Sequence, residues 1–276
     1  MSVSIALFQS TTGIDPVANG DALVAAIEEA AAGGAAMLFT PEMSGLLDRD
    51  STRARNNLAE EQGDRVLARC REAARNRSIW LHLGSLAVLA GNGKVANRAF
   101  VIDPAGEVRA RYDKMHLFDV DLPTGESWRE SATYSAGGEA VVVDDTPLGK
   151  LGLTICYDVR FPGLFARLAE AGAEVIAVPA AFTVPTGEAH WHVLLRARAI
   201  EAGLFVIAAA QVGAHADGRR TYGHSLVVDP WGEILLDMGE RAGVGFATID
   251  PQRIAEVRSR LPALSHRRAI PDAVTV

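Results

Sequence analysis

The chain has 276 residues, of which 49% are hydrophobic and 22% are charged, so it can bury a large core in one or two domains. Its formal net charge of −7 and its pI near 5.5 argue against nucleic acid or an anionic membrane surface as the main partner. No segment approaches the roughly 20 uninterrupted apolar residues of a membrane-spanning helix, and the N-terminus lacks the basic region of a signal peptide. Two cysteines are too few for a disulfide framework, so we expect a cytoplasmic location.

The predicted elements occur in the same order twice along the chain. In each half, apolar strands alternate with amphipathic helices in the order strand, helix, strand, helix, strand, and a hairpin follows. The first half places these five elements at 3–9, 15–32, 35–39, 59–77 and 79–85. The second half places them at 151–155, 162–171, 174–178, 189–202 and 204–210. The two hairpins share the turn sequence Asp-Pro-x-Gly, at 103–106 and 229–232, so we expect a pseudo-duplicated architecture.

The strands of both halves are apolar on both faces, as in 174–178 and 205–210, which indicates that both faces are buried. Helices can cover one face of each sheet, and the other sheet must then cover the second face. We therefore expect an α/β fold, a four-layer α-β-β-α sandwich with two mixed sheets, in a single domain over 1–276. A single doubly wound sheet is the alternative. The longest irregular stretch, 119–138, has the length of a functional loop.

Cys156 is a candidate nucleophile because of its place between predicted elements. It follows the apolar strand at 151–155 and precedes Pro162, which can open a helix. Backbone N–H groups of the intervening turn are expected to lower the pKa of the thiol and to hold an oxyanion. The alternative is a buried structural cysteine, which is how we interpret Cys70 inside a predicted helix.

A carboxylate and a cation follow two other predicted strands. Glu42 ends the segment Leu-Phe-Thr-Pro-Glu, and Lys114 lies in Arg-Tyr-Asp-Lys-Met-His just after a strand. Functional residues of α/β proteins gather at strand ends, so a base, a cation and a nucleophile are expected to meet there.

With their neighbours, these three segments resemble the nitrilase-type carbon–nitrogen hydrolases, whose signature is a Glu-Lys-Cys triad, and the resemblance extends from Val3 to about Arg268. It implies the α-β-β-α fold and hydrolysis of an amide through a thioester on Cys156. Glu42 is then expected to relay the proton, with a pKa that burial shifts toward neutrality while the Lys114 charge shifts it the other way. The Lys114 ammonium and the Tyr157 N–H are expected to stabilise the oxyanion, with no metal or organic cofactor.

Four further residues are candidates for positioning the substrate or Lys114: Glu130, Tyr157, Arg160 and Thr183. Glu130 resembles an additional glutamate of the family, and its alternative role is a solvated loop acid. Arg160 is a candidate partner for a substrate carboxylate, and its alternative is a contact with Asp158 or a helix terminus. His190 and His192 suggest a metal pair but lack a third ligand at helical spacing, so we predict no metal there.

The residues at 157–162, Tyr-Asp-Val-Arg-Phe-Pro, are similar to the branch of this family that contains ω-amidase and deaminated glutathione amidase. Segments 189–201 and 261–268 are most similar to the latter. The resemblance implies a small linear amide as substrate, either deaminated glutathione or an ω-amide of a dicarboxylic acid. A nitrilase, an N-carbamoyl amide hydrolase and a non-catalytic binding protein of the same fold are the alternatives.

A homodimer or higher homo-oligomer is also expected. Helix 189–202 carries Trp191, Leu194 and Leu195, and segment 161–168 carries further large apolar residues. These are more apolar residues than a single face of each helix can bury against its own sheet. A two-fold pairing would cover them, and the C-terminal tail at 262–276 is predicted to reach across the interface.

Overall fold

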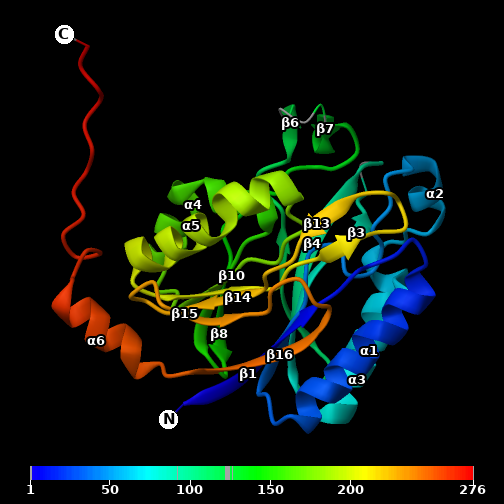
Figure 1. The fold of residues 1–276 in the computed structure, drawn as a ribbon, viewed down its shortest axis with the longest axis horizontal. Helices are drawn as coiled ribbons and strands as arrows, with labels where there is room; N and C mark the ends of the chain where they lie inside the picture. The colour runs from blue at the N-terminus through cyan, green and yellow to red at the C-terminus, as the bar shows by residue number, and fades with distance from the viewer. Residues whose placement is uncertain (1, 92, 122–124, 126, 276) are drawn as a thin grey trace.

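Two six-stranded mixed sheets lie at the centre of the computed structural model, which describes residues 2–91, 93–121, 125 and 127–275 (Figure 1). The first sheet has the order β16-β1-β2-β3-β4-β5. Its strands are β1 (Val3–Gln9), β2 (Met37–Phe39), β3 (Trp80–Leu89), β4 (Val95–Ile102), β5 (Val108–Asp113) and β16 (Gly243–Ile249). The second sheet has the order β8-β9-β10-β11-β14-β15. Its strands are β8 (Val142–Thr146), β9 (Gly149–Leu153), β10 (Val175–Ala177), β11 (Phe205–Ala208), β14 (Leu226–Val228) and β15 (Ile234–Asp237).

The two sheets repeat one pairing pattern. From β16 to β5, neighbouring strands pair antiparallel, parallel, parallel, antiparallel and antiparallel. From β8 to β15 the same sequence of pairings recurs. This correspondence confirms the predicted pseudo-duplication, with β1 and β9 as equivalent strands and β2 and β10 as the next pair.

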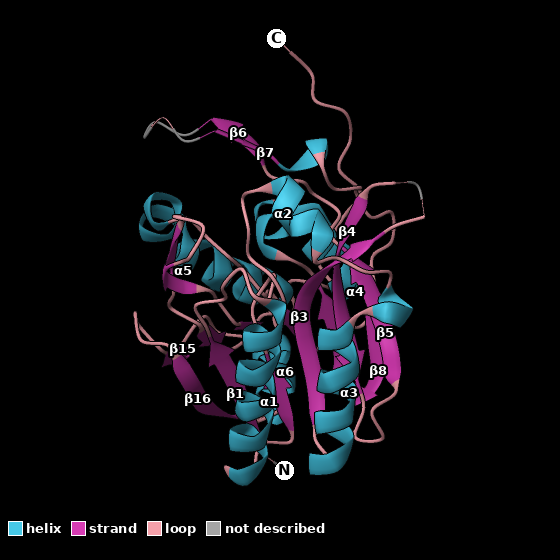
Figure 2. Cartoon of the chain, turned by 90° about the vertical axis from the view of Figure 1, so that its right-hand side faces the viewer, coloured by secondary structure: helices cyan, strands magenta, loops and turns pink. Residues whose placement is uncertain are grey.

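A pair of helices covers the outer face of each sheet (Figures 1 and 2). The helices are α1 (Pro16–Ala32) and α3 (Arg65–Arg77) on the first sheet, and α4 (Pro162–Glu170) and α5 (Val184–Ala202) on the second. Asp15 caps α1 by accepting the Val17 N–H, with Pro16 in the first turn. These layers confirm the predicted four-layer α-β-β-α sandwich.

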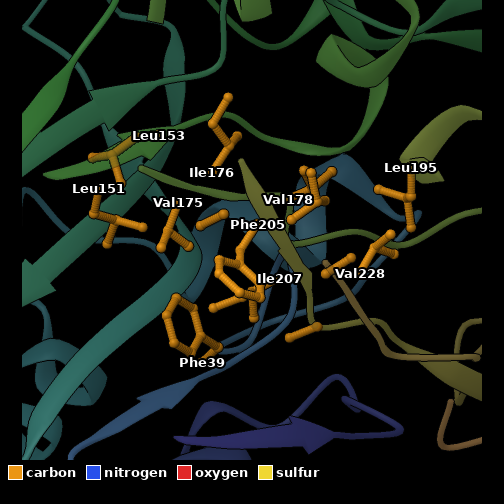
Figure 3. Packing of buried hydrophobic residues seen from close by; sticks show 14 of the residues in the cluster. Phe39, Leu151, Leu153, Val175, Ile176, Val178, Leu195, Phe205, Ile207 and Val228 are labelled. Carbon is orange, nitrogen blue, oxygen red and sulfur yellow. The ribbon is translucent and has the colours of Figure 1, made fainter. Parts of the chain in front are cut away.

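The core lies on both faces of the sheets because adjacent strand residues point to opposite sides. Phe39 packs between the sheets with Leu151, Val175 and Ile207 (Figure 3), whereas its neighbour Leu38 packs under α1 and α3. Burial on both faces explains the continuous apolar runs of these strands. Cys70 belongs to the layer under α1 and α3 and is fully buried, as predicted.

Several element boundaries differ from the prediction. The helix predicted over 59–77 begins at Arg65, because Asp64 caps it by accepting the Leu67 N–H. The helix predicted over 189–202 begins at Val184, with a proline in its first turn. The sequence patterns did not reveal α2 (Ser51–Asn56), α6 (Gln252–Arg260) or β16.

Two small antiparallel ribbons lie outside the main sheets. They are β6 (Asp119–Asp121) with β7 (Ser127–Arg129), and β12 (Val212–Ala214) with β13 (Arg220–Tyr222). The first ribbon belongs to the long stretch predicted at 119–138, of which residues 122–124 and 126 lie outside the described residues. Within the described part of the chain, no helix has both the length and the apolar character needed to cross a membrane.

Some of the apolar residues predicted for a dimer surface are buried inside the chain, whereas Leu194 and Phe161 are partly exposed. Trp191 and Leu195 are fully buried, because this face of α5 packs on the second sheet, and the large apolar residues of α4 are buried as well. The exposed apolar residues of α5 are Val193, 68% exposed, and Ile200, 42% exposed. The predicted tail at 262–276, whose last residue is outside the described part, follows α6 and lies apart from the sheets (Figure 1).

Candidate active site

Glu42, Lys114 and Cys156 each follow a strand, after β2, β5 and β9 respectively. Their side chains converge between the two halves. The Lys114 ammonium lies 3.0 Å from Glu42 Oε1, and the Cys156 thiol lies close enough to the Glu42 carboxylate for each group to shift the pKa of the other. All three residues are at least 92% buried, since their exposed fractions are 5% for Glu42, 2% for Lys114 and 8% for Cys156. The structure therefore brings the three predicted residues together.

The backbone at Cys156 is held in an uncommon conformation. Cys156 has a φ of 50°, in the left-handed region that costs a non-glycine residue about 1–2 kcal/mol. Its N–H donates to the Pro179 carbonyl at 2.8 Å, and Cys156 is the first residue of a 3-10 turn, Cys156–Arg160. Strain of this kind collects at functional sites, where the surrounding structure enforces it.

Asp158 connects the cysteine turn to the lysine loop. Its fully buried carboxylate accepts the Ile155 N–H at 2.8 Å and the Tyr112 hydroxyl at 2.7 Å. It also accepts the His116 N–H at 3.0 Å and contacts His116 Nδ1 at 2.7 Å. The His116 ring stacks on Phe161, with centroids 3.6 Å apart. One carboxylate thus connects the segments that carry Cys156 and Lys114.

Glu130 lies against Lys114 and does not point into solvent. Its two carboxylate oxygens are 2.9 and 3.1 Å from Lys114 Nζ, and one also accepts the Phe118 N–H at 2.7 Å. Lys114 therefore lies between two carboxylates. Asn97 donates from Nδ2 to both of them, at 2.9 Å to Glu42 and 3.3 Å to Glu130.

The charges of the triad depend on burial and on close partners. Burial, and next the Glu42 carboxylate, raise the pKa of the Cys156 thiol well above its ordinary value. The prediction that backbone donors lower this pKa was wrong, because the N–H of Ala181 contributes less than burial does. A pKa raised in this direction favours the neutral thiol at Cys156.

Glu42 and Lys114 are held in their charged forms. Burial alone would raise the pKa of Glu42, but Lys114 and hydrogen bonds from Cys156 and Asn97 lower it below its ordinary value. The predicted shift toward neutrality is therefore wrong for the free site. Burial alone would lower the pKa of Lys114, but the Glu130 and Glu42 carboxylates outweigh it and raise this pKa.

A cavity of about 740 Å³ opens onto the triad. Tyr157, Arg160 and Thr183 all line it, as do Glu130 and the triad residues. Besides Lys114, seven basic residues line the same cavity: Arg49, Arg55, Lys94, Arg129, Arg160, Arg219 and Arg220. Volumes of about 300–1,000 Å³ are typical of small-molecule sites.

The auxiliary residues differ in how they are held. Arg160 does not pair with Asp158; its guanidinium lies 3.3 Å from His190 Nδ1 and 5.5 Å from the Phe182 ring. Thr183 precedes α5 at its cap position, and its hydroxyl is 2.8 Å from that of Thr186.

The Tyr157 ring packs edge-on against Phe118 and Phe161, with centroids 5.1 and 5.2 Å away. These contacts fix the side chain next to the nucleophile, at the wall of the cavity.

Two contributors to the site were missed in the sequence. One is Asn97, a fully buried amide in the apolar strand β4. A polar residue within an apolar strand was the sequence feature that could have indicated it, because buried polar groups need partners. The other is the Ala181 N–H, which donates to Glu42 Oε2 at 2.9 Å. Backbone donors leave no signal in a sequence.

Comparison with known proteins identifies the family of the chain. Residues 4–259 match the carbon–nitrogen hydrolase family. A relative named deaminated glutathione amidase, from Yersinia enterocolitica, is 41% identical over 87% of this chain and 85% of its own length. The crystal structure of the NitFhit protein of C. elegans superposes with a TM-score of 0.89 at 40% identity, covering 97% of this chain and 65% of that one.

A third similar structure is that of a double mutant of the amidase from Nesterenkonia sp. AN1 in complex with acrylamide. It has a TM-score of 0.81 at 30% identity, over 96% of this chain and 94% of that one. These likenesses confirm the resemblance inferred from the sequence motifs. The chain therefore belongs to the carbon–nitrogen hydrolase family and is a hydrolase of the amidase type.

Proposed function

We propose that Glu42, Lys114 and Cys156 catalyse amide hydrolysis through a thioester on Cys156. The observation that carries this proposal is the convergence of a buried carboxylate, ammonium and thiol at the floor of one cavity. A neutral thiol is a weak nucleophile and needs a neighbouring base, and Glu42 is the carboxylate that interacts with it.

In the first half of the reaction, Cys156 Sγ attacks the amide carbonyl carbon while its proton passes to Glu42. The carbonyl oxygen becomes an oxyanion. The Lys114 ammonium and the backbone N–H of Tyr157 are the groups we assign to stabilise it. Glu42 then delivers the proton to the nitrogen as the C–N bond breaks, which releases ammonia or an amine and leaves the thioester.

In the second half, Glu42 takes a proton from water, and the resulting hydroxide attacks the thioester carbonyl. The C–S bond breaks, the thiol regains its proton, and a carboxylic acid leaves. Glu130 and Asn97 hold Lys114 and Glu42 in place throughout, because each contacts the charged groups directly.

We propose a small linear amide that carries a carboxylate as substrate, either deaminated glutathione or an ω-amide of a dicarboxylic acid. The basic lining of the cavity supports an anionic substrate, because the whole chain is acidic and these cations are gathered around one opening. Relatives from several organisms are named deaminated glutathione amidase.

A panel of substrates tests this function. Deaminated glutathione, ω-amides of dicarboxylic acids, the matching nitriles and N-carbamoyl amino acids are each incubated with the enzyme, and the acid and the released ammonia or amine are quantified. We expect turnover of the anionic amides and little or none of the nitriles. Preferred turnover of nitriles or N-carbamoyl compounds would assign one of those activities instead, and no turnover of any compound would favour a binding protein.

We also propose a homodimer in the reducing cytoplasm. Exposed Val193 and Ile200 on α5, Trp231 before β15 and Ile270 in the tail support pairing with a second copy. Both cysteines are free, which suits a reducing compartment. Light scattering at micromolar concentration is expected to give twice the monomer mass, and a fully active monomer would refute the pairing.

A further inference from the structure

Three potential metal ligands meet at the surface, apart from the residues that line the cavity. His192 lies on α5, His224 lies between β13 and β14, and Asp237 ends β15. Their donor atoms all lie within 4.8 Å of one another. His192 Nε2 is 3.0 Å from Asp237 Oδ2, and His224 Nδ1 is 2.9 Å from Asp237 Oδ1. The sequence had shown only the two helix histidines, of which His190 turns to Arg160 instead.

The surrounding structure holds these side chains in place. The Gly239 N–H donates to Asp237 Oδ1 at 2.9 Å, which orients the carboxylate. The His224 N–H donates to the Gly239 carbonyl at 2.7 Å, and the His224 carbonyl accepts from Trp191 Nε1 at 2.8 Å. These bonds keep His224 at a φ of 53°, and the Tyr222 ring stacks on its imidazole with centroids 4.4 Å apart.

We propose that His192, His224 and Asp237 bind a divalent transition-metal ion, with Zn²⁺ as the best match. Two imidazole nitrogens and one carboxylate oxygen are a common three-ligand set for zinc. At metal–ligand distances of about 2.0–2.1 Å, the donors of a tetrahedral site are about 3.3 Å apart. From the single carboxylate oxygen Oδ2 of Asp237, the separations are 3.0 Å to His192 Nε2 and 3.2 Å to His224 Nδ1, which are close to that value.

The fourth position of such a site faces solvent and takes a water. The side chains of His192, His224 and Asp237 are 29%, 20% and 33% exposed, so an ion can enter without a rearrangement of the fold. The ion would tie α5 to the hairpin of β14 and β15. Since α5 begins next to Thr183 at the cavity wall, the ion would stabilise the helix that supports this wall.

The test uses the full-length chain without an affinity tag and with Cys156→Ala, because a catalytic thiol also binds zinc. Titration calorimetry with Zn²⁺ and visible absorption with Co²⁺ report stoichiometry and coordination. We expect one ion per chain, with the absorption of a four- or five-coordinate Co²⁺. With Zn²⁺ at a hundredfold excess over Kd, Tm is expected to rise by about 5 °C.

Three variants in this background decide the assignment. His192→Ala is expected to lose the site, and Asp237→Asn, which keeps the shape of the side chain, to weaken binding about 10- to 100-fold. His190→Ala, two residues away on the same helix, is the matched control and is expected to bind normally.

The proposal would be overturned if the Cys156→Ala parent bound no stoichiometric ion. It would also be overturned if His192→Ala and Asp237→Asn bound the ion as tightly as the parent does. The three residues would then form only a hydrogen-bonded His–Asp–His cluster. If His192→Ala does not fold by circular dichroism, Asp237→Asn decides alone.

Discussion

The two cysteines occupy two different regions of the molecule, and both are buried. Cys70 lies in the apolar layer between the first sheet and the helices α1 and α3, where burial raises its pKa to about 12. Cys156 lies between the halves of the sandwich, and its pKa is raised as well. The direction of the thiol pKa therefore does not separate a structural cysteine from a nucleophile.

The difference between them lies in their neighbours. Cys156 interacts with the Glu42 carboxylate and the Lys114 ammonium, has a left-handed backbone and lies at an open cavity. Cys70 is on a regular helix and is packed among apolar residues. We infer that Cys156 is activated when substrate binds, by transfer of its proton to Glu42, rather than being held as a resting thiolate.

Removing each thiol gives the largest contrast. Cys156→Ala is expected to fold normally and to lose kcat by roughly 10⁵-fold or more, because the nucleophile is absent. Cys70→Ala is expected to keep most of its activity and to lose about 1–2 kcal/mol of stability, because a buried group leaves a small cavity. Steady-state kinetics and urea unfolding of both variants check this. Full activity in Cys156→Ala would refute the assignment.

Glu42→Gln tests how the thiol is activated. Glutamine keeps the shape of the side chain but accepts no proton, so kcat is expected to fall about 10²–10⁴-fold. Alkylation of Cys156 by iodoacetamide is expected to slow in parallel, whereas mass mapping is expected to show Cys70 unreactive in both proteins. Unchanged alkylation of Cys156 in Glu42→Gln would mean that this carboxylate is not the base.

Glu130→Gln tests whether Glu130 positions Lys114, which it contacts directly. Lys114 then keeps one carboxylate instead of two, so its raised pKa is expected to fall and its position to loosen, with a loss of about 10- to 100-fold in kcat. The alkaline limb of the pH–rate profile is expected to move to lower pH, a shift that a purely structural role would not give. Glu139→Gln, an exposed acid, is the control and should leave the profile unchanged.

His82 gives a smaller effect, on stability rather than on activity. It is fully buried on β3, neither ring nitrogen has a hydrogen-bond partner among the described residues, and burial lowers its pKa to about 3. The unfolded chain takes up this proton near pH 6.5, so the stability contribution is present above pH 6.5 and is lost as pH falls toward 3.

As pH falls from 6.5 toward 3, His82 lowers the free energy of unfolding by up to about 1.4 kcal/mol per pH unit. His82→Leu is expected to remove this contribution. Urea unfolding from pH 7 to pH 4 measures it. His190→Leu, an exposed histidine, is the control. Parallel stability curves for the wild type and His82→Leu would contradict the prediction.

The sandwich and the triad positions could be predicted because both depend on local patterns. Strands buried on both faces are apolar throughout, as Met37–Phe39 and Val175–Ala177 are, and the triad residues follow such strands directly. The equivalence of strands in the two halves could also be predicted, because the elements occur in the same order in each half.

The rest depends on contacts between distant residues. The face of α5 that looked free for a partner is the face that packs on the second sheet, because Trp191 and Leu195 lie one turn apart on its inner side. Which side of a helix faces inward follows from docking, not from composition. Asn97 was missed for the same reason, since its two carboxylate partners come from other parts of the chain.

The most direct test of the account is to trap the acyl-enzyme. The enzyme is mixed with a reactive ω-amide, quenched in acid within the first turnovers, and digested for peptide mass mapping. We predict a mass increase equal to the acyl group, located on Cys156 and labile to hydroxylamine, and absent from Cys156→Ala. Continued turnover with no adduct on Cys156, or an adduct located on Cys70, would contradict the thioester mechanism.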